Sequence, residues 1–304
     1  DMLAYPSFRE RILAERRARP VTILARPPKA IGEVRYADRA PLEQECASFA
    51  AALAAQRTTF VETFMTAPSP GIVATGMANA HYERFEDYVN AVAEALRTEY
   101  EYIIAQGHVL QIDAPDLAME RHVYFGERPL GDFLDFVDLT IAAINRALTN
   151  VPRERVRLHV CWGNYEGPHT FDVPLEDILA HLYQARVGGL LLSMANPRHA
   201  HEWRCFQRNP LPDTMLLLAG VIDTTTNYVE HPEVVADRIE TAARAVGDPH
   251  RVVAATDCGF GTAAGSNTVA EELVWEKLRT LRQGADIATQ RLFVNAPPSR
   301  GSPV

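Results

Sequence analysis

The sequence predicts an α/β fold in which the strands of a parallel sheet alternate with helices. From about residue 60, short apolar runs rich in β-branched residues alternate with longer segments of helical spacing. The chain has 304 residues, of which 47% are hydrophobic and 23% charged, so it is long enough to enclose a large core. This alternation fits either a (β/α)₈ barrel or an open doubly wound sheet, and strand number alone does not separate them.

The predicted strands share an apolar run bounded by turn-forming residues. They cover residues 60–67, 109–115, 156–163, 189–195, 215–223 and 252–259. The predicted helices between them repeat apolar residues every three or four positions, and cover 85–107, 130–151, 175–186 and 232–247. Because helices connect successive strands, we expect the strands to run parallel.

The chain divides into three predicted parts. Residues 1–56 form an N-terminal arm with a charged helix, a hairpin or extended segment at 20–34 and a helix at 42–56. Residues 57–290 form the body of alternating strands and helices. Residues 291–304 read as a flexible tail.

Composition excludes several classes of protein. The formal net charge of -9 argues against a nucleic-acid partner, because such proteins usually present a basic surface to phosphates. We find no apolar run of signal-peptide length near the start and none long enough to span a membrane, so we expect a cytoplasmic protein without a membrane partner. The sequence allows a homo-oligomer. Four scattered cysteines do not form a disulfide framework, which leaves them available for thiol or metal chemistry.

Three soft side chains lie at predicted strand ends. His159 and Cys161 are two residues apart on a strand, so they face the same side, and Cys258 ends the last strand beside two glycines. In a barrel these strand ends meet on one face. One imidazole and two thiolates are a three-ligand set for catalytic zinc, with the fourth position open. The alternative is that both cysteines and the histidine are ordinary core residues.

Other polar residues follow the predicted strands. Asp113 could bind an amino group or cap the next helix. Asp223 ends a strand in the same way, and Ser69 lies between two prolines. The remaining candidates for substrate contact or proton transfer are Gln111, Asn196, Arg198 and Glu202. The loop that carries the last three also contains His199 and His201.

Five motifs resemble the catalytic domain of cobalamin-independent methionine synthase and its shorter relatives, which include epoxyalkane:coenzyme M transferase-like proteins. In the family's order they are QIDAP, HVCWGNYEG, NPRHAHEW, GVIDTTTNYVEHPEVV and TDCGFGT, and the resemblance spans about residues 60 to 285. It implies a (β/α)₈ TIM-type barrel that lacks the family's first two strands in this chain. It also implies a zinc ion, held by His159, Cys161 and Cys258, that activates a thiol for alkylation.

Two positions depart from the family's pattern. Ser193 stands where methionine synthases supply a glutamate to the zinc, and Thr225 stands where they place a histidine acid. Zinc with two thiolates is neutral, whereas a site with an added glutamate is negative. The neutral site should lower the pKa of a bound substrate thiol more strongly, and the resulting thiolate should be less nucleophilic. These departures put 5-methyltetrahydrofolate in doubt as the donor.

The sequence therefore predicts zinc-dependent methyl or alkyl transfer to a thiol. Asp113 is expected to hold the amino group of a thiol such as homocysteine, whereas Arg198 would suit the sulfonate of coenzyme M. Gln111, Asp223 and Glu202 are further candidates for substrate contact or proton transfer. A second candidate activity is coenzyme M addition to an epoxide. Two interpretations of a different kind compete with both: a non-catalytic zinc-binding barrel, with His199, His201 or Glu202 as fourth ligand, and a relative of the uroporphyrinogen decarboxylases.

Overall fold

The computed structural model describes residues 3–18, 27–262 and 268–294. The chain separates into two compact units. The first, here called the β2–β5 unit, comprises Ile23–Trp162 and Phe171–Leu190. The second, the β7–β8 unit, comprises Asp1–Thr22, Gly163–Thr170 and Leu191–Val304.

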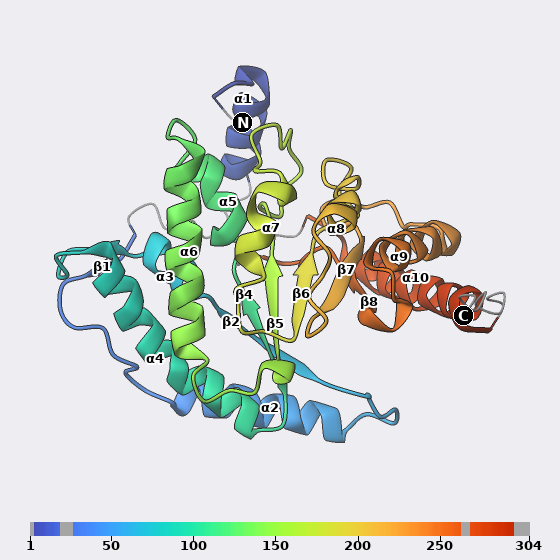
Figure 1. The fold of residues 1–304 in the computed structure, drawn as a ribbon, viewed down its shortest axis with the longest axis horizontal. Helices are drawn as coiled ribbons and strands as arrows, with labels where there is room; N and C mark the ends of the chain where they lie inside the picture. The colour runs from blue at the N-terminus through green and yellow to red at the C-terminus, as the bar shows by residue number, and fades with distance from the viewer. Residues whose placement is uncertain (1–2, 19–26, 263–267, 295–304) are drawn as a thin grey trace, which may run out of the picture. The chain divides into compact units, whose positions relative to one another are not determined.

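The β2–β5 unit is built on three parallel strands. β2 (Phe64–Pro68) pairs with β4 (Val109–Asp113), which pairs in turn with β5 (Val156–Val160). The helices of this unit are α2 (Ala40–Ala54), α3 (Pro70–Gly76), α4 (Phe85–Ala105), α5 (Asp116–Val123), α6 (Leu130–Ala147) and α7 (Leu175–Leu182). The two longest, α4 and α6, lie side by side (Figure 1).

Burial of apolar side chains explains why these elements pack together. Leu110 and Ile112 of β4 are wholly buried, as are Tyr88 and Tyr100 on α4 and Phe133 on α6. Full burial of one such side chain stabilises the fold by roughly 1.5–3 kcal/mol. The amphipathic pattern predicted for 85–107 and 130–151 is thus confirmed by the buried faces of α4 and α6.

Residues 20–34 of the N-terminal arm were predicted to form a hairpin or an extended segment. Residues 20–26 lie outside the described residues. Within the described part, β1 (Lys29–Ala30) pairs in parallel with β3 (Ala78–Asn79), so these residues do not form the predicted hairpin. The helix expected at 42–56 is present as α2.

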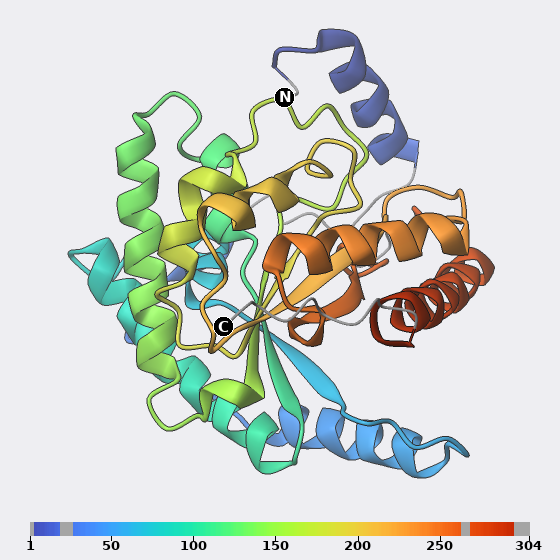
Figure 2. The same cartoon turned by 45° about the vertical axis from the view of Figure 1, so that its right-hand side comes forward.

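The β7–β8 unit contains the parallel strands β7 (Leu216–Ile222) and β8 (Val252–Thr256). Its helices are α1 (Pro6–Ala18), α8 (Cys205–Arg208), α9 (Pro232–Val246) and α10 (Glu271–Thr289). Short helical turns complete it at Glu202–Arg204, Pro249–Arg251 and Gln290–Val294, and one more, Arg153–Arg155, precedes β5. α9 and α10 pack along each other (Figure 2). α9 ends at Gly247, whose φ of 83° suits a residue without a Cβ.

The predicted α/β class with parallel strands is confirmed. All six predicted strands are present, the fourth as β6 (Gly189–Leu192), and each predicted crossover helix is found within its predicted range. The boundaries of the arm, body and tail stay a prediction. In the part of the chain that the structure describes, we find no helix long and apolar enough to cross a membrane.

Candidate functional site

His159 and Cys161 lie at the carboxyl end of β5. Both are buried, with 4% and 5% of their surfaces exposed. Their ligand atoms lie within 4.8 Å of each other, so the pair can contact one metal ion. The next residue, Trp162, donates its indole N–H to the backbone oxygen of Val173 at 2.7 Å, which anchors the chain directly after Cys161. The structure therefore brings together two of the three predicted zinc ligands within one unit.

Asp113 is the register partner of His159 on the neighbouring strand. Its Oδ1 atom lies 3.9 Å from Nε2 of His159, and the Asp113 side chain is 45% exposed. α5 begins at Asp116, and its N-cap residue, Pro115, forms no side-chain cap. The alternative role of Asp113 as a helix cap stays a prediction. The Asp113 carboxylate places negative charge beside the histidine.

Gln111 and Ser69 have different surroundings. Gln111 precedes Asp113 by two residues on β4 and therefore shares its face. Its buried Oε1 atom accepts no hydrogen bond from the described residues. Ser69 is wholly buried: its Oγ donates to Asp116 at 2.5 Å and accepts the N–H of Ile72 at the start of α3. These bonds give Ser69 a structural role, and its predicted contact with substrate stays a prediction.

Cys258 belongs to the β7–β8 unit and follows β8 by two residues. Hydrogen bonds hold the backbone at Cys258 and at the next residue, Gly259. Thr256 donates its hydroxyl to the carbonyl of Cys258 at 2.8 Å, and Asn164 donates its amide to the carbonyl of Gly259 at 2.8 Å. The Cys258 thiol is half-buried and forms no disulfide. The glycine-rich loop thus begins from a fixed backbone.

Asp257, which sequence reasoning missed, organises this end of the unit. Its buried carboxylate accepts the backbone N–H groups of Met194, Ala195 and Asn196 at 2.9, 2.9 and 2.8 Å. Burial raises the pKa of Asp257 to about 6, although the three N–H groups act in the opposite direction. The sequence feature that could have indicated this site is Gly220, an isolated glycine in the apolar strand β7. A glycine inside a strand often marks a place where another part of the chain approaches the strand closely.

Ser193 and the loop after it lie against Asp257. The Ser193 hydroxyl donates to the backbone oxygen of Asp257 at 3.0 Å. Asn196 accepts the N–H of Arg198 at 2.9 Å, and the Arg198 side chain is exposed. Ser193, at the position expected to match the family's glutamate, therefore binds the residue next to Cys258. It stays only a predicted fourth metal position.

His199 and Glu202 form a buried pair in the same loop. Nδ1 of His199 lies 2.9 Å from Oε2 of Glu202. His169, a second buried histidine that the sequence analysis did not identify, packs edge-on against His199, and their ligand atoms lie within 4.8 Å. His201 is exposed. Of the three residues proposed for closed zinc coordination, two therefore bind each other.

Asp223 holds the turn after β7. Its Oδ1 accepts the backbone N–H of Thr225 at 2.6 Å and the Thr225 hydroxyl at 2.9 Å. The wholly buried Lys277 donates to the backbone oxygen of Asp223 and to Glu230. One carboxylate oxygen of Asp223 thus accepts the hydrogen bonds that stabilise the turn with Thr225. The catalytic role of Asp223 stays a prediction.

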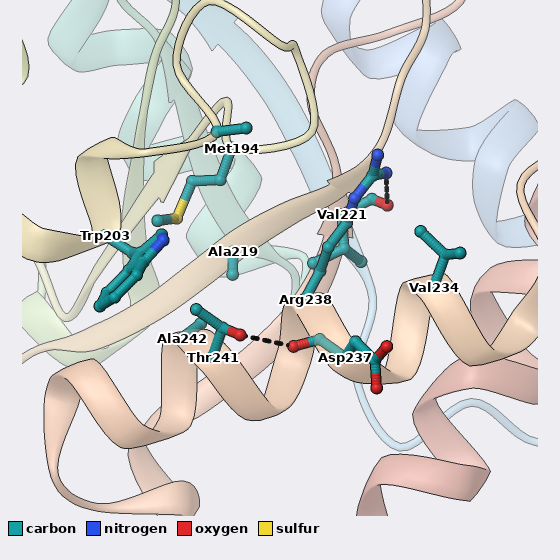
Figure 3. Close-up of a pocket in the computed structure, with 10 residues that line it drawn as sticks. Met194, Trp203, Ala219, Val221, Val234, Asp237, Arg238, Thr241 and Ala242 are labelled. Carbon is teal, nitrogen blue, oxygen red and sulfur yellow. Dashed lines mark hydrogen bonds between the residues drawn. The ribbon is translucent and has the colours of Figure 1, made fainter.

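A separate pocket of about 220 Å³ lies within the β7–β8 unit (Figure 3). Trp203, Met194 and Ala219 supply apolar walls, and Arg238 donates to the backbone oxygen of Val221. None of its lining residues is a predicted site residue. One of its lining residues, Met194, donates its backbone N–H to Asp257.

Comparisons with known proteins support the resemblance. No family model matches the chain. The chain is 25% identical over 237 residues to 2-hydroxypropyl-CoM lyase of Xanthobacter autotrophicus (strain ATCC BAA-1158 / Py2), which covers 70% of this chain and 57% of the lyase. It is 26% identical over 235 residues to the uncharacterized protein YxjH of Bacillus subtilis (strain 168), covering 71% of this chain and 58% of YxjH. The chain thus spans somewhat more than half the length of these relatives.

The fold is similar to that of a solved enzyme. A B12-independent methionine synthase from Shewanella sp. W3-18-1, in complex with selenomethionine, superposes with a TM-score of 0.64. The match covers 86% of this chain and 70% of that chain at 20% sequence identity, so it shows the fold alone. The resemblance predicted from five sequence motifs is therefore confirmed: the fold is similar to that of a B12-independent methionine synthase, and the sequence is similar to that of 2-hydroxypropyl-CoM lyase.

Proposed function

We propose that this protein is a zinc-dependent enzyme that transfers a methyl or other alkyl group to a thiol. The observation that carries the proposal is the buried pair His159 and Cys161, whose ligand atoms lie within 4.8 Å at a strand end. The names of two similar proteins denote compounds with an alkyl group on sulfur, methionine and 2-hydroxypropyl-CoM. Both observations agree with thiol alkylation.

The donor set suits zinc. An imidazole and a thiolate are ligands that zinc prefers, and Cys258 would supply the second thiolate. Chain connectivity supports this third ligand: Asn164 follows Cys161 by three residues and binds the carbonyl of Gly259, the residue next to Cys258. Because three residues of extended chain span at most about 11 Å, Cys161 cannot lie far from Asn164, the residue that binds the Cys258 loop.

A bound zinc ion would favour the deprotonated form of an incoming thiol by contributing positive charge. Asp113 would bind the ammonium group of an amino-acid thiol, because its carboxylate lies beside His159 and is partly exposed. If the thiol were coenzyme M, Arg198 would bind its sulfonate instead. The buried pair of His199 and Glu202 is better suited than Asp223 to move a proton, because the Asp223 Oδ1 atom already serves the turn.

The donor is proposed only as a class. Homocysteine methylation by 5-methyltetrahydrofolate or another methyl donor fits the family, but Thr225 supplies no acid to the leaving nitrogen. Its hydroxyl donates to Asp223. Addition of coenzyme M to an epoxide is the second candidate, favoured by the similarity to 2-hydroxypropyl-CoM lyase. A non-catalytic zinc-binding barrel is the rival from a different class.

Cysteine substitutions test the ligand set. We expect the wild-type protein to bind one zinc ion, and C161A and C258A each to lower its zinc affinity by at least about 100-fold, because each removes a thiolate from the metal. C46A and C205A are control variants, since Cys46 and Cys205 are buried cysteines outside disulfides and neither is a proposed ligand. Zinc affinity is measured by competition with a chelator.

The outcome that contradicts the proposal is equally definite. If C161A and C258A retain the zinc affinity of C46A and C205A, the metal is bound elsewhere. If the wild-type protein binds no zinc, the proposed function fails.

A further inference from the structure

Asp257 is the residue before the proposed ligand Cys258, and its side chain is directed away from solvent. Only 5% of its surface is exposed. Burying a carboxylate is costly unless hydrogen bonds replace its hydration. Three backbone N–H groups, from Met194, Ala195 and Asn196, replace it here at 2.8 to 2.9 Å. The carboxylate is therefore bound to one short segment of chain.

That segment follows β6 and begins at Ser193. The Ser193 hydroxyl donates to the backbone oxygen of Asp257 at 3.0 Å, and the Asp257 N–H donates to the carbonyl of Ile222 at 2.9 Å. Side chain, N–H and carbonyl of Asp257 are thus all engaged. They tie the start of the Cys258 loop to the residues after β6 and to the end of β7.

Gly220 of β7 leaves the space that Asp257 occupies. A Cβ at Gly220 would lie 2.2 Å from Oδ1 of Asp257, 2.9 Å from its Cα and 2.8 Å from the backbone oxygen of Leu192. No side chain fits at these distances without a backbone shift. The strand therefore has a glycine where the carboxylate and the end of β6 approach it.

We infer that Asp257 is a positioning residue for the zinc site, which holds the Cys258 backbone at a fixed place against the Ser193–Asn196 segment. The inference rests on the proposed function, since it assumes that Cys258 is a zinc ligand. Asp257 itself contacts neither metal nor substrate in this role. It acts through Cys258, and through Asn196 it also fixes the start of the loop that carries Arg198 and His199.

The substitution D257N tests the inference, because asparagine keeps the shape but has one carbonyl oxygen for three donors and adds an N–H₂ group among them. We expect zinc affinity to fall about 10- to 100-fold, as it does when residues that orient ligands are lost. We also expect the thiolate-to-cobalt absorption of the cobalt-substituted protein to shift. The matched control is D116N, which alters another buried carboxylate, in the other unit.

Each outcome decides the matter. If Asp257 has only a structural role, D257N and D116N should both lower the melting temperature, and both should keep the wild-type zinc affinity and cobalt spectrum. That result would overturn the inference. If D257N does not fold, S193A replaces it: loss of the single bond to the Asp257 carbonyl should weaken zinc binding a few-fold and shift the spectrum, without loss of an oxygen ligand in X-ray absorption at the zinc edge. No change in zinc affinity, or loss of an oxygen ligand, which would make Ser193 itself a ligand, overturns the inference. Wild-type protein without zinc would instead contradict the proposed function itself.

Discussion

Asp113 and His159 are register partners on β4 and β5 but differ in exposure. His159 is buried, whereas the Asp113 side chain is 45% exposed and lies 3.9 Å from the imidazole Nε2. A carboxylate in this position reaches both the proposed metal ligand and the solvent from which a substrate enters. If the proposed function holds, Asp113 would select a thiol by the charge on the rest of that molecule.

Asp113 should determine affinity for an amino-acid thiol. We expect D113N to weaken homocysteine binding about 10- to 100-fold, since a hydrogen bond between charged groups contributes roughly 1.5–3 kcal/mol. Binding of 4-mercaptobutanoate, which lacks the amino group, should change little. Isothermal titration of both thiols measures the difference, and an equal loss for the two would show that Asp113 does not recognise the amino group.

Local sequence pattern predicted part of the site and missed the rest. His159 and Cys161 share a side because alternation along a strand is a local property. Asp257 was missed because its partners, residues 194–196, lie about sixty positions away and bind through backbone N–H groups, which no residue type reveals. The buried pairing of His199 with Glu202 depends in the same way on how the loop folds.

At the scale of elements, α3 and α5 are joined by a buried hydrogen bond. Ser69 caps α3 and donates to Asp116, the first residue of α5. Gly71 of α3 allows this approach, since a Cβ there would lie 2.1 Å from Oδ2 of Asp116. Burial raises the pKa of Asp116 to about 7, and that of Glu120 on the same helix to about 7. Both carboxyls are thus more readily protonated in the folded state.

This contact should make stability depend on pH. Because the folded-state pKa of Asp116 lies above its unfolded value, its contribution is fully present below about pH 4 and is lost as the pH rises to about 7. Asparagine does not titrate, so the free energy of unfolding of D116N should fall less than that of the wild type between pH 5 and pH 7. The difference between the two slopes should be at most about 1.4 kcal/mol per pH unit. Urea unfolding at several pH values measures this, and parallel curves for the two proteins would contradict it.

The elements were predicted better than their ends. Each of the six predicted strands exists, because long apolar runs between turn residues are a strong signal. The first begins at Phe64 rather than at residue 60, and residues 60–62 are exposed despite Phe60 and Val61. β8 ends at Thr256, not at residue 259, and the carbonyl of Gly259 accepts the side-chain amide of Asn164 instead of a strand partner. Where a strand stops depends on its partners, which local sequence does not specify.

At the scale of the whole molecule, the chain passes between its two units several times. His159 and Cys161 belong to the β2–β5 unit, whereas Cys258 and residues 163–170 belong to the β7–β8 unit. The proposed ligands are therefore contributed by segments about a hundred residues apart. A metal ion that requires all three would couple the stability of the protein to metal binding.

X-ray absorption at the zinc edge tests the central proposal most directly, on purified protein with homocysteine, with coenzyme M and with neither. The proposal predicts one nitrogen and two sulfur ligands from the protein, and a third sulfur when the correct thiol is added. Coordination by four protein ligands that neither thiol changes would contradict thiol alkylation and favour the non-catalytic zinc-binding barrel. Absence of zinc would contradict both.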